Sequence, residues 1–172
     1  MPKNIKINVE GHRFLDNGKV CEDVTSVVLP SLEHPTTPIE NVSGMAMDMD
    51  IPNTSRYKAA EYSVAHNNGN NCEQLQNPGL HKQEFRVARQ DYENKNTSIG
   101  YEGIKFRLTG LFKSVEKGTI QTGNPYGSTV KYSLKRYEEL VNGVQTLLVD
   151  ATANKLTVNG TSYTDDIEKL LK

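Results

Sequence analysis

Short runs of alternating apolar and polar residues, separated by turn-forming residues, recur along most of this 172-residue chain. Ile5, Ile7 and Val9, for example, alternate with lysine and asparagine. Successive side chains of a β-strand point to opposite faces, so this period of two predicts strands. Asn-Gly pairs at 142–143 and 159–160 predict tight hairpins, because both central positions of such a turn favour positive φ. The pattern restricts the chain to a mostly antiparallel β fold.

The predicted elements follow from the same pattern. A short flanking helical segment is predicted within 72–76, and a terminal helix over 164–171, with Thr164 as its N-cap and Ile167, Leu170 and Leu171 on one face. We expect one domain, 1–172, forming an antiparallel β-sandwich or barrel with these two short helices. Ile104, Phe106 and Leu108 are expected on the buried side of the longest predicted strand, 101–116. The other predicted strands are 5–9, 24–29, 45–51, 59–66, 85–91, 130–140, 146–150 and 155–158.

Residues 30–44 contain three prolines and are predicted to leave the sheet. Pro30, Pro35 and Pro38 lack backbone donors, so no central strand is expected there. A connection of this length is uncommon in a compact domain unless something else orders it. The segment is therefore predicted to be a long excursion between two strands.

Composition and motifs indicate no chemistry. The formal net charge is −1 and tryptophan is absent, so a nucleic-acid-binding surface is not expected. The histidines are scattered, with His66 expected at the surface, and no nucleotide-binding, metal-binding or nucleophile motif occurs. No cofactor, metal or catalytic residue is predicted. Cys21 and Cys72 are expected to be free thiols of a reducing cytosol. No signal peptide or membrane-spanning run is seen, and no stable membrane anchoring is expected.

Two successive predicted strands each carry a polar row. In 45–51 and 59–66, Asp48, Asp50, Glu61 and Ser63 lie opposite apolar residues such as Met47. An ordinary sandwich with one wet face explains this pattern, and periodicity alone favours that interpretation. The wall of a water-filled channel explains it as well, and the pattern does not separate the two.

An ordered set of segments resembles one family. The set comprises Val24–Leu32 (VTSVVLPSL), the proline-rich excursion, the strand at 44–51, Leu108–Val115 (LTGLFKSV), and the ending from Lys131 through two Asn-Gly turns to a short helix. Together these resemble the major tail tube proteins of contractile-tailed phages, which also build R-type bacteriocins. The resemblance implies a hexameric ring whose subunits share one continuous inner β-barrel, leaving no sheet edge exposed.

The resemblance also implies residue roles. It places the four polar residues named above in the lumen, where their charge would repel DNA and let it slide. It places the excursion against a neighbouring subunit and the adjacent ring, and a further loop toward the sheath. The excursion residues are Pro30, Glu33, His34, Pro35, Pro38, Glu40 and Asn41, and the sheath-facing residues are Asn71, Glu73, Gln74 and Gln76.

The function implied by the resemblance is mechanical, not enzymatic. Rings stack into a hollow tube that sheath contraction drives through a target envelope. The implied partners are further copies of the chain, the sheath, baseplate and tail terminator proteins, a tape-measure protein in the lumen, and DNA in transit in a phage. Assembly is expected in the bacterial cytoplasm, and the product is a virion tail or a released bacteriocin. A type VI secretion-like ring that carries effectors is the alternative, and an unrecognised β-barrel enzyme is a third.

Overall fold

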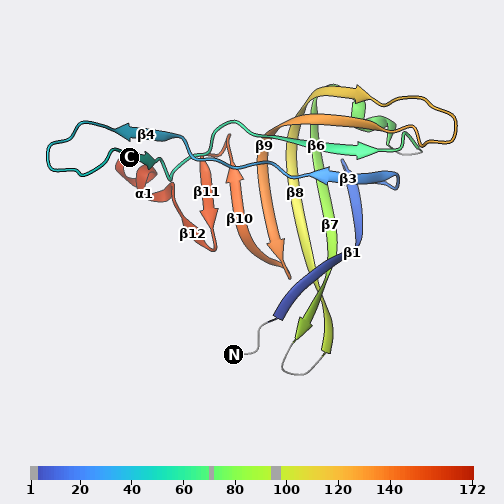
Figure 1. The fold of residues 1–172 in the computed structure, drawn as a ribbon, viewed down its shortest axis with the longest axis horizontal. Coiled ribbons are helices and arrows are strands. Elements are labelled where there is room, and N and C mark those ends of the chain that lie inside the picture. The colour runs from blue at the N-terminus through green and yellow to red at the C-terminus, as the bar shows by residue number, and fades with distance from the viewer. Residues whose placement is uncertain (1–3, 70–71, 94–97) are drawn as a thin grey trace.

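The chain forms a strongly bent β structure, and a computed structural model describes residues 4–69, 72–93 and 98–172 (Figure 1). The described residues contain one 3-10 turn, η1 (Glu73–Gln76), and one α-helix, α1 (Asp165–Leu170). The mainly β prediction is confirmed. The strands are β1 (Asn4–Asp16), β2 (Lys19–Cys21), β3 (Val24–Val28), β4 (Thr36–Ile39), β5 (Met49–Pro52), β6 (Glu61–His66), β7 (Leu80–Glu93), β8 (Ser98–Lys117), β9 (Ser128–Val141), β10 (Val144–Asp150), β11 (Lys155–Val158) and β12 (Thr161–Ser162).

Ten strands form one antiparallel sheet that folds over itself into two layers. The main path runs β12-β11-β10-β9-β8-β7-β1-β2, and β6 joins β3 to the first half of β9. We call β3, β6 and the adjoining segments 111–117 and 128–134 layer A. Layer B consists of β2, β1, β7, β10, β11, β12 and the remaining parts of β8 and β9. Figure 1 shows β3 and β6 running across the strands of layer B. The sandwich is therefore built from one continuous sheet.

The layers are joined by β8 and β9, which pass from one to the other. Their register shifts at Thr109/Gly110 and again at Phe112/Ser114, as expected where a bulge increases the bend of a strand. Gly110 lies at this bend. A Cβ there would come within 2.6 Å of the Tyr62 hydroxyl and 2.7 Å of its ring. The absence of a side chain lets Tyr62 pack directly against the bent backbone.

Replacing Gly110 by alanine should destabilise the fold. The new methyl group must displace the Tyr62 ring, and overpacking of this kind costs about 1–3 kcal/mol. Urea denaturation would measure the free energy of unfolding. Gly11→Ala is the matched control, because a Cβ at Gly11 would meet nothing within 4 Å. Equal stabilities for the two variants would contradict this account of the bend.

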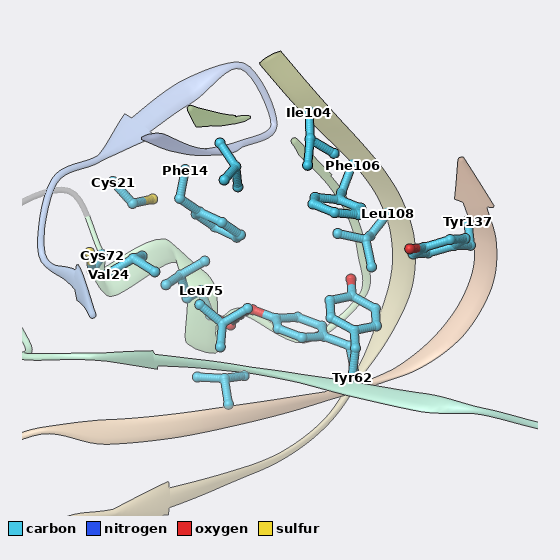
Figure 2. Close-up of a cluster of buried hydrophobic side chains, with 14 residues drawn as sticks. Phe14, Cys21, Val24, Tyr62, Cys72, Leu75, Ile104, Phe106, Leu108 and Tyr137 are labelled. Atoms are coloured by element: carbon cyan, nitrogen blue, oxygen red, sulfur yellow. Dashed lines mark hydrogen bonds between the residues drawn. The ribbon is translucent and has the colours of Figure 1, made fainter. Parts of the chain in front are cut away.

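The hydrophobic core fills the space between the layers (Figure 2). The rings of Tyr62 from layer A and Tyr132 from β9 stack at 5.1 Å, and the Tyr132 hydroxyl donates a hydrogen bond to the Leu75 carbonyl at 2.6 Å. Leu75 belongs to η1, so this bond attaches the 3-10 turn to the core. Burial raises the pKa of both tyrosines, which keeps them neutral. Phe14, Val64, Phe106 and Leu108 complete the centre of the core.

A buried polar network lies beside this core. The Nδ1 atom of His81 is 2.9 Å from Oδ1 of Asp16, and its Nε2 is 2.8 Å from the Asn77 carbonyl. The Asn77 carbonyl can only accept, so Nε2 of His81 carries a hydrogen and donates to it. Gln83 donates to the same Asp16 oxygen at 3.1 Å. The network ties the ends of β1 and β7 together.

The tight turns agree with the sequence prediction. Asn17-Gly18, Asn142-Gly143 and Asn159-Gly160 all have positive φ at both residues, and each connects two paired strands. The strand at 155–158 has the predicted bounds. The predicted Ile104, Phe106 and Leu108 face of β8 is buried.

Two local predictions are wrong. Residues 45–48 are not a strand, because they belong to the tip of the β4–β5 hairpin, where Asn41 and Gly44 adopt positive φ. His66 is 1% exposed instead of lying at the surface.

Two other predictions hold in part. β4 lies within the proline-rich excursion, but it is an edge strand in which Pro38 is tolerated, so the excursion contains no central strand. Thr164 is the N-cap residue of α1, but its hydroxyl accepts from Leu156 N at 3.4 Å, and Ser162 Oγ instead accepts from Asp165 N.

Candidate assembly surfaces

The solvent face of layer A is mostly polar, with Val28 and Leu111 exposed among the polar residues, and its charges are paired. Glu61 and Ser63 lie on this face of β6, while Tyr62 and Val64 point into the core. Lys113 forms an ion pair with Glu61, and Lys131 forms one with Glu116. The face is therefore closer to neutral than its predicted carboxylates indicated. The sequence did not reveal this pairing, because Lys113 is the extra residue of the β8 bulge between Phe112 and Ser114, and β9 lies between β8 and β6.

The proline-rich excursion and the segment after it form one projecting hairpin. β4 and β5 pair only with each other among the described residues, in a two-stranded sheet separate from the main one. Figure 1 shows this hairpin extending beyond layer B at the end that carries the C-terminus. Asp48 and Asp50 therefore lie on the hairpin, not on the strand next to β6 in the subunit. Asp48 accepts a hydrogen bond from Asn41 N at 3.1 Å, which closes the tip.

The base of the hairpin is fixed by several contacts. Asn53 N donates to the Pro35 carbonyl at 2.8 Å, and Lys58 N donates to the Glu33 carbonyl at 2.8 Å. The ring of His34 stacks on Tyr57 at 4.2 Å. Of the predicted contact residues, Glu33, His34 and Pro35 thus lie at the base. Pro38, Glu40 and Asn41 lie farther out, and Pro30 directly follows the strand region at 24–29.

The outer part of the hairpin exposes apolar side chains that the sequence suggested would be buried. Met47 is 76% exposed, and its neighbours Val42, Met45, Met49 and Ile51 are exposed too. A row of apolar residues on a two-stranded projection cannot form a core of its own. Exposed apolar patches of this kind mark interaction sites. The alternation in 45–51 therefore does not mark the buried side of a strand within the subunit, and it leaves these apolar side chains uncovered.

The predicted sheath-facing residues do not form one surface. Glu73 is exposed, but Gln74 is half-buried and donates to the Asp16 carbonyl at 3.4 Å. Gln76 accepts a hydrogen bond from Lys117. Asn71 lies outside the described residues. The side chain of Gln74 thus fastens η1 to the end of β1.

Two cysteines lie under the same turn. Cys21 and Cys72 are buried free thiols, and Gln74 donates toward the Cys21 sulfur at 3.6 Å. Burial, with a smaller contribution from Cys72, raises the pKa of Cys21 to about 12, and burial also raises the pKa of Cys72. Thiolates are the reactive form, so both residues are inert in the folded chain.

Apolar side chains are also exposed at both ends of the chain. Near the N-terminus, Ile5, Ile7 and Val9 are exposed on β1. At the C-terminus, Leu170 is 87% exposed, as is most of Leu171. Edge strands remain as well, because within the described part of the chain β3 pairs only with β6, and β2 and β12 end the main path. The subunit thus leaves both apolar side chains and backbone hydrogen-bonding groups uncovered.

The N-terminal part of layer B is held by a buried carboxylate. Glu102 is 5% exposed and accepts hydrogen bonds from Lys6 and Arg89, with Arg89 Nε at 2.8 Å. The Lys6 hydrogen bond, followed by that of Arg89, lowers the pKa of Glu102. A carboxylate with a lowered folded-state pKa stabilises the fold above its unfolded pKa. That stabilisation is lost as the pH falls through the folded pKa.

Glu102→Gln should therefore destabilise the fold at neutral pH and have little effect in acid. Removing the charge weakens the hydrogen bonds from Lys6 and Arg89, although Lys6 keeps a second carboxylate, Asp91, at 3.6 Å, and the cost should be about 1–3 kcal/mol at pH 7. In strong acid the wild-type carboxyl is protonated too, so the two free energies of unfolding should converge. Urea titrations between pH 7 and pH 2 would measure the difference. A difference that is independent of pH would rule out the ion pairs as its source.

The described residues contain no cluster of three or more His, Cys, Asp or Glu side chains that could hold a metal ion. None of the helices in the described part of the chain is long and apolar enough to cross a membrane. The uncovered strand edges, exposed apolar residues and projecting hairpin instead define a subunit that is built to assemble.

Comparison with known families identifies the kind of assembly. The family described as phage tail tube protein FII matches residues 9–171. The chain belongs to this family of tail tube proteins. No individually curated protein matches the chain significantly.

Two solved chains share the fold. One comes from the cryo-EM structure of an extracellular contractile injection system, the PVC sheath–tube complex in the extended state. It aligns with a TM-score of 0.53 and 10% identity over 78% of this chain and 90% of that one. The other comes from the PVC sheath/tube terminator in the extended state, with a TM-score of 0.53 and 9% identity over 78% of this chain and 96% of that one. At such identity, the likeness concerns the fold.

Proposed function

We propose that six copies of this chain close a ring with layer A facing inward, and that the rings stack into the inner tube of a contractile tail. The observation that carries the proposal is layer A itself. It is a layer with a mostly polar, charge-paired solvent face, and its outer strand, β3, has a free edge. Pairing through such edges would continue the layer from subunit to subunit and cover the exposed backbone groups.

The hairpin supplies the second contact. Its exposed methionines and Val42 would be covered by a neighbouring copy in the same or the adjacent ring. Asp48 and Asp50 would reach the lumen only if the hairpin lies along the wall formed by neighbouring subunits. Head-to-tail contacts of this type do not limit length, so a tape-measure protein and a terminator would set it.

The role is mechanical, without a reaction. The sheath, anchored with the tube on a baseplate, would drive the tube through a target envelope. A lumen wall with paired charges would let DNA or another polyanion slide without binding tightly. The particle would assemble in the bacterial cytoplasm as a virion tail or a bacteriocin. The family match supports a tube over a type VI secretion-like carrier ring.

The lumen assignment can be tested by labelling. In monomers, cysteine at Ser63→Cys should react with both a small maleimide and a polymer-linked one. In tubes, it should react only with the small reagent, which can diffuse along the bore. Lys105→Cys, on the outer face of layer B, is the matched control and should react with both. Reaction of both reagents at Ser63→Cys in tubes would refute the inward orientation.

Function can be tested at the same wall. Glu61→Lys and the pair Asp48→Lys and Asp50→Lys should still permit rings to form, but should reduce infectivity or killing by placing uncompensated cations along the path. Normal particle activity for both variants would contradict their lumen position, whereas an effect of only one would show which of β6 and the hairpin lines the bore.

A further inference from the structure

We propose that a shallow hollow on the outer face of layer B is the docking site for an acidic segment of the sheath protein that encloses the tube. The inference rests on the proposed function, since layer B forms the tube exterior only if layer A faces the lumen. It differs from the sequence prediction, which placed the sheath contact around η1.

The floor of the hollow is a row of the smallest residues. Gly11 pairs with Ala88, and Ala88 pairs with Gly103, so the row crosses β1, β7 and β8. These residues alternate with the buried side chains of Val87 and Ile104, which places them on the face away from the core. At a strand spacing of about 4.8 Å, the row is roughly 10 Å long. The hollow has a volume of about 490 Å³.

The subunit explains one of the two glycines and not the other. Neither Gly11 nor Gly103 has a positive φ, and a Cβ at either position would meet nothing within 4 Å. Gly11 lies where the register of the β1–β7 pair shifts, and a glycine within a strand often marks such a bulge. The β7–β8 register has no shift at Gly103, where glycine weakens the strand by roughly 0.5–1 kcal/mol relative to alanine. The remaining reason for Gly103 is the close approach of a segment from another molecule.

The side of the hollow is basic. A row of basic residues crosses the same three strands: Arg13 pairs with Arg86, and Arg86 pairs with Lys105. Each lies two residues along its strand from the small row, and therefore on the same face. Arg86 forms an ion pair with Glu84, but Arg13 has no carboxylate within ion-pair distance among the described residues. The face continues with Lys82, Arg107 and Arg136, against the carboxylates Glu84, Glu138 and Asp150. Cations therefore exceed carboxylates on this face, although the chain as a whole carries a net charge of −1.

These features specify the chemistry of the partner segment. Its backbone must come close to the sheet above Gly103, and a carboxylate must reach Arg13 or Lys105. A small apolar side chain can contact Leu140, which also lines the hollow. Nucleic acid fits less well, because Glu84 and Glu138 interrupt the positive field on this face and would repel phosphates. A protein segment with carboxylates beside an apolar residue satisfies all three conditions.

The first test fills the hollow. The double variant Gly11→Val with Gly103→Val should have a thermal midpoint and a yield of tubes that are equal to or slightly higher than those of the wild type. The fraction of tubes that are enclosed in a sheath, counted by electron microscopy of particles from producing cells, should fall at least tenfold. Thr157→Val, on the same face but on β11, is the control and should remain sheathed. A wild-type level of sheathed tubes in the filled variant would overturn the proposal.

The second test uses charge and contact. Arg13→Glu with Lys105→Glu should also yield bare tubes, while Lys155→Glu, an exposed change at the far edge of layer B, should not. A photo-crosslinking residue in place of Lys105 should attach to an acidic segment of the sheath protein in intact particles. Attachment to DNA or to a second tube subunit would refute the assigned partner. Failure of the unaltered chain to form tubes would instead refute the proposed function, and this inference with it.

Discussion

Removing the β4–β5 hairpin should abolish tube formation and leave the subunit folded. The hairpin contributes no strand to the main sheet, and its ends meet at its base, where Asn53 N donates to the Pro35 carbonyl at 2.8 Å. Residues 36–52 can therefore be replaced by an Asn-Gly pair without stretching the chain. We expect a thermal midpoint within a few degrees of wild type, and no tubes by electron microscopy or sedimentation.

A milder variant separates the hairpin's surface from its backbone. Met45→Ser with Met47→Ser keeps the two-stranded pairing and the Asn41–Asp48 contact, but removes exposed apolar area. Burying a methionine side chain is worth about 1.5–3 kcal/mol, so the critical concentration for polymerisation should rise by at least tenfold. Tubes that form at the wild-type concentration in both variants would mean that the hairpin is not an assembly contact.

Removing the Asp16 carboxylate should produce the largest loss of stability of any single change considered. Asp16 is fully buried, and its Oδ1 lies 2.9 Å from Nδ1 of the buried His81 ring and 3.1 Å from the Gln83 amide nitrogen. Asp16→Ala leaves both of these buried groups without that partner, at a cost of about 1–3 kcal/mol for each. Urea denaturation followed by circular dichroism would measure the free energy of unfolding.

A double variant distinguishes the cost of unpaired buried polar groups from the cost of lost packing. Asp16→Leu with His81→Leu removes both polar partners and fills the space with apolar atoms, which can be nearly neutral for stability. We expect it to be more stable than Asp16→Ala. If the free energy of unfolding of Asp16→Ala instead lies within about 1 kcal/mol of the wild-type value, the buried pair does not have the role assigned to it.

The sequence predicted the strands well where a local signal was strong. Asn-Gly pairs at 142–143 and 159–160 set the register of the β9–β10 and β11–β12 hairpins, because only a few turn conformations join two such strands. The alternation of Ile104, Phe106 and Leu108 identified the buried face of β8, because every second side chain of a strand points to the same face. Local backbone geometry was sufficient for both.

The errors arose where burial depends on partners distant in sequence. Met45, Met47 and Met49 alternate as in a half-buried strand, but no core is present beside the hairpin tip. His66 looked like a surface residue at a strand end, yet β3 and β9 enclose it. Lys113 pairs with Glu61 across 52 residues through the bulge in β8. None of these relationships has a signature in a short window of sequence.

The passage of β8 and β9 through both layers has a mechanical consequence. In a sandwich of two separate sheets, only side-chain packing resists sliding of one sheet over the other. Here each layer shares two covalent backbones with the other. A shear force must therefore change backbone torsions and strain the ladder hydrogen bonds at the bends near Gly110 and Leu134, in addition to disturbing side-chain packing. A shaft made of such units would transmit a sudden axial thrust with little internal slip.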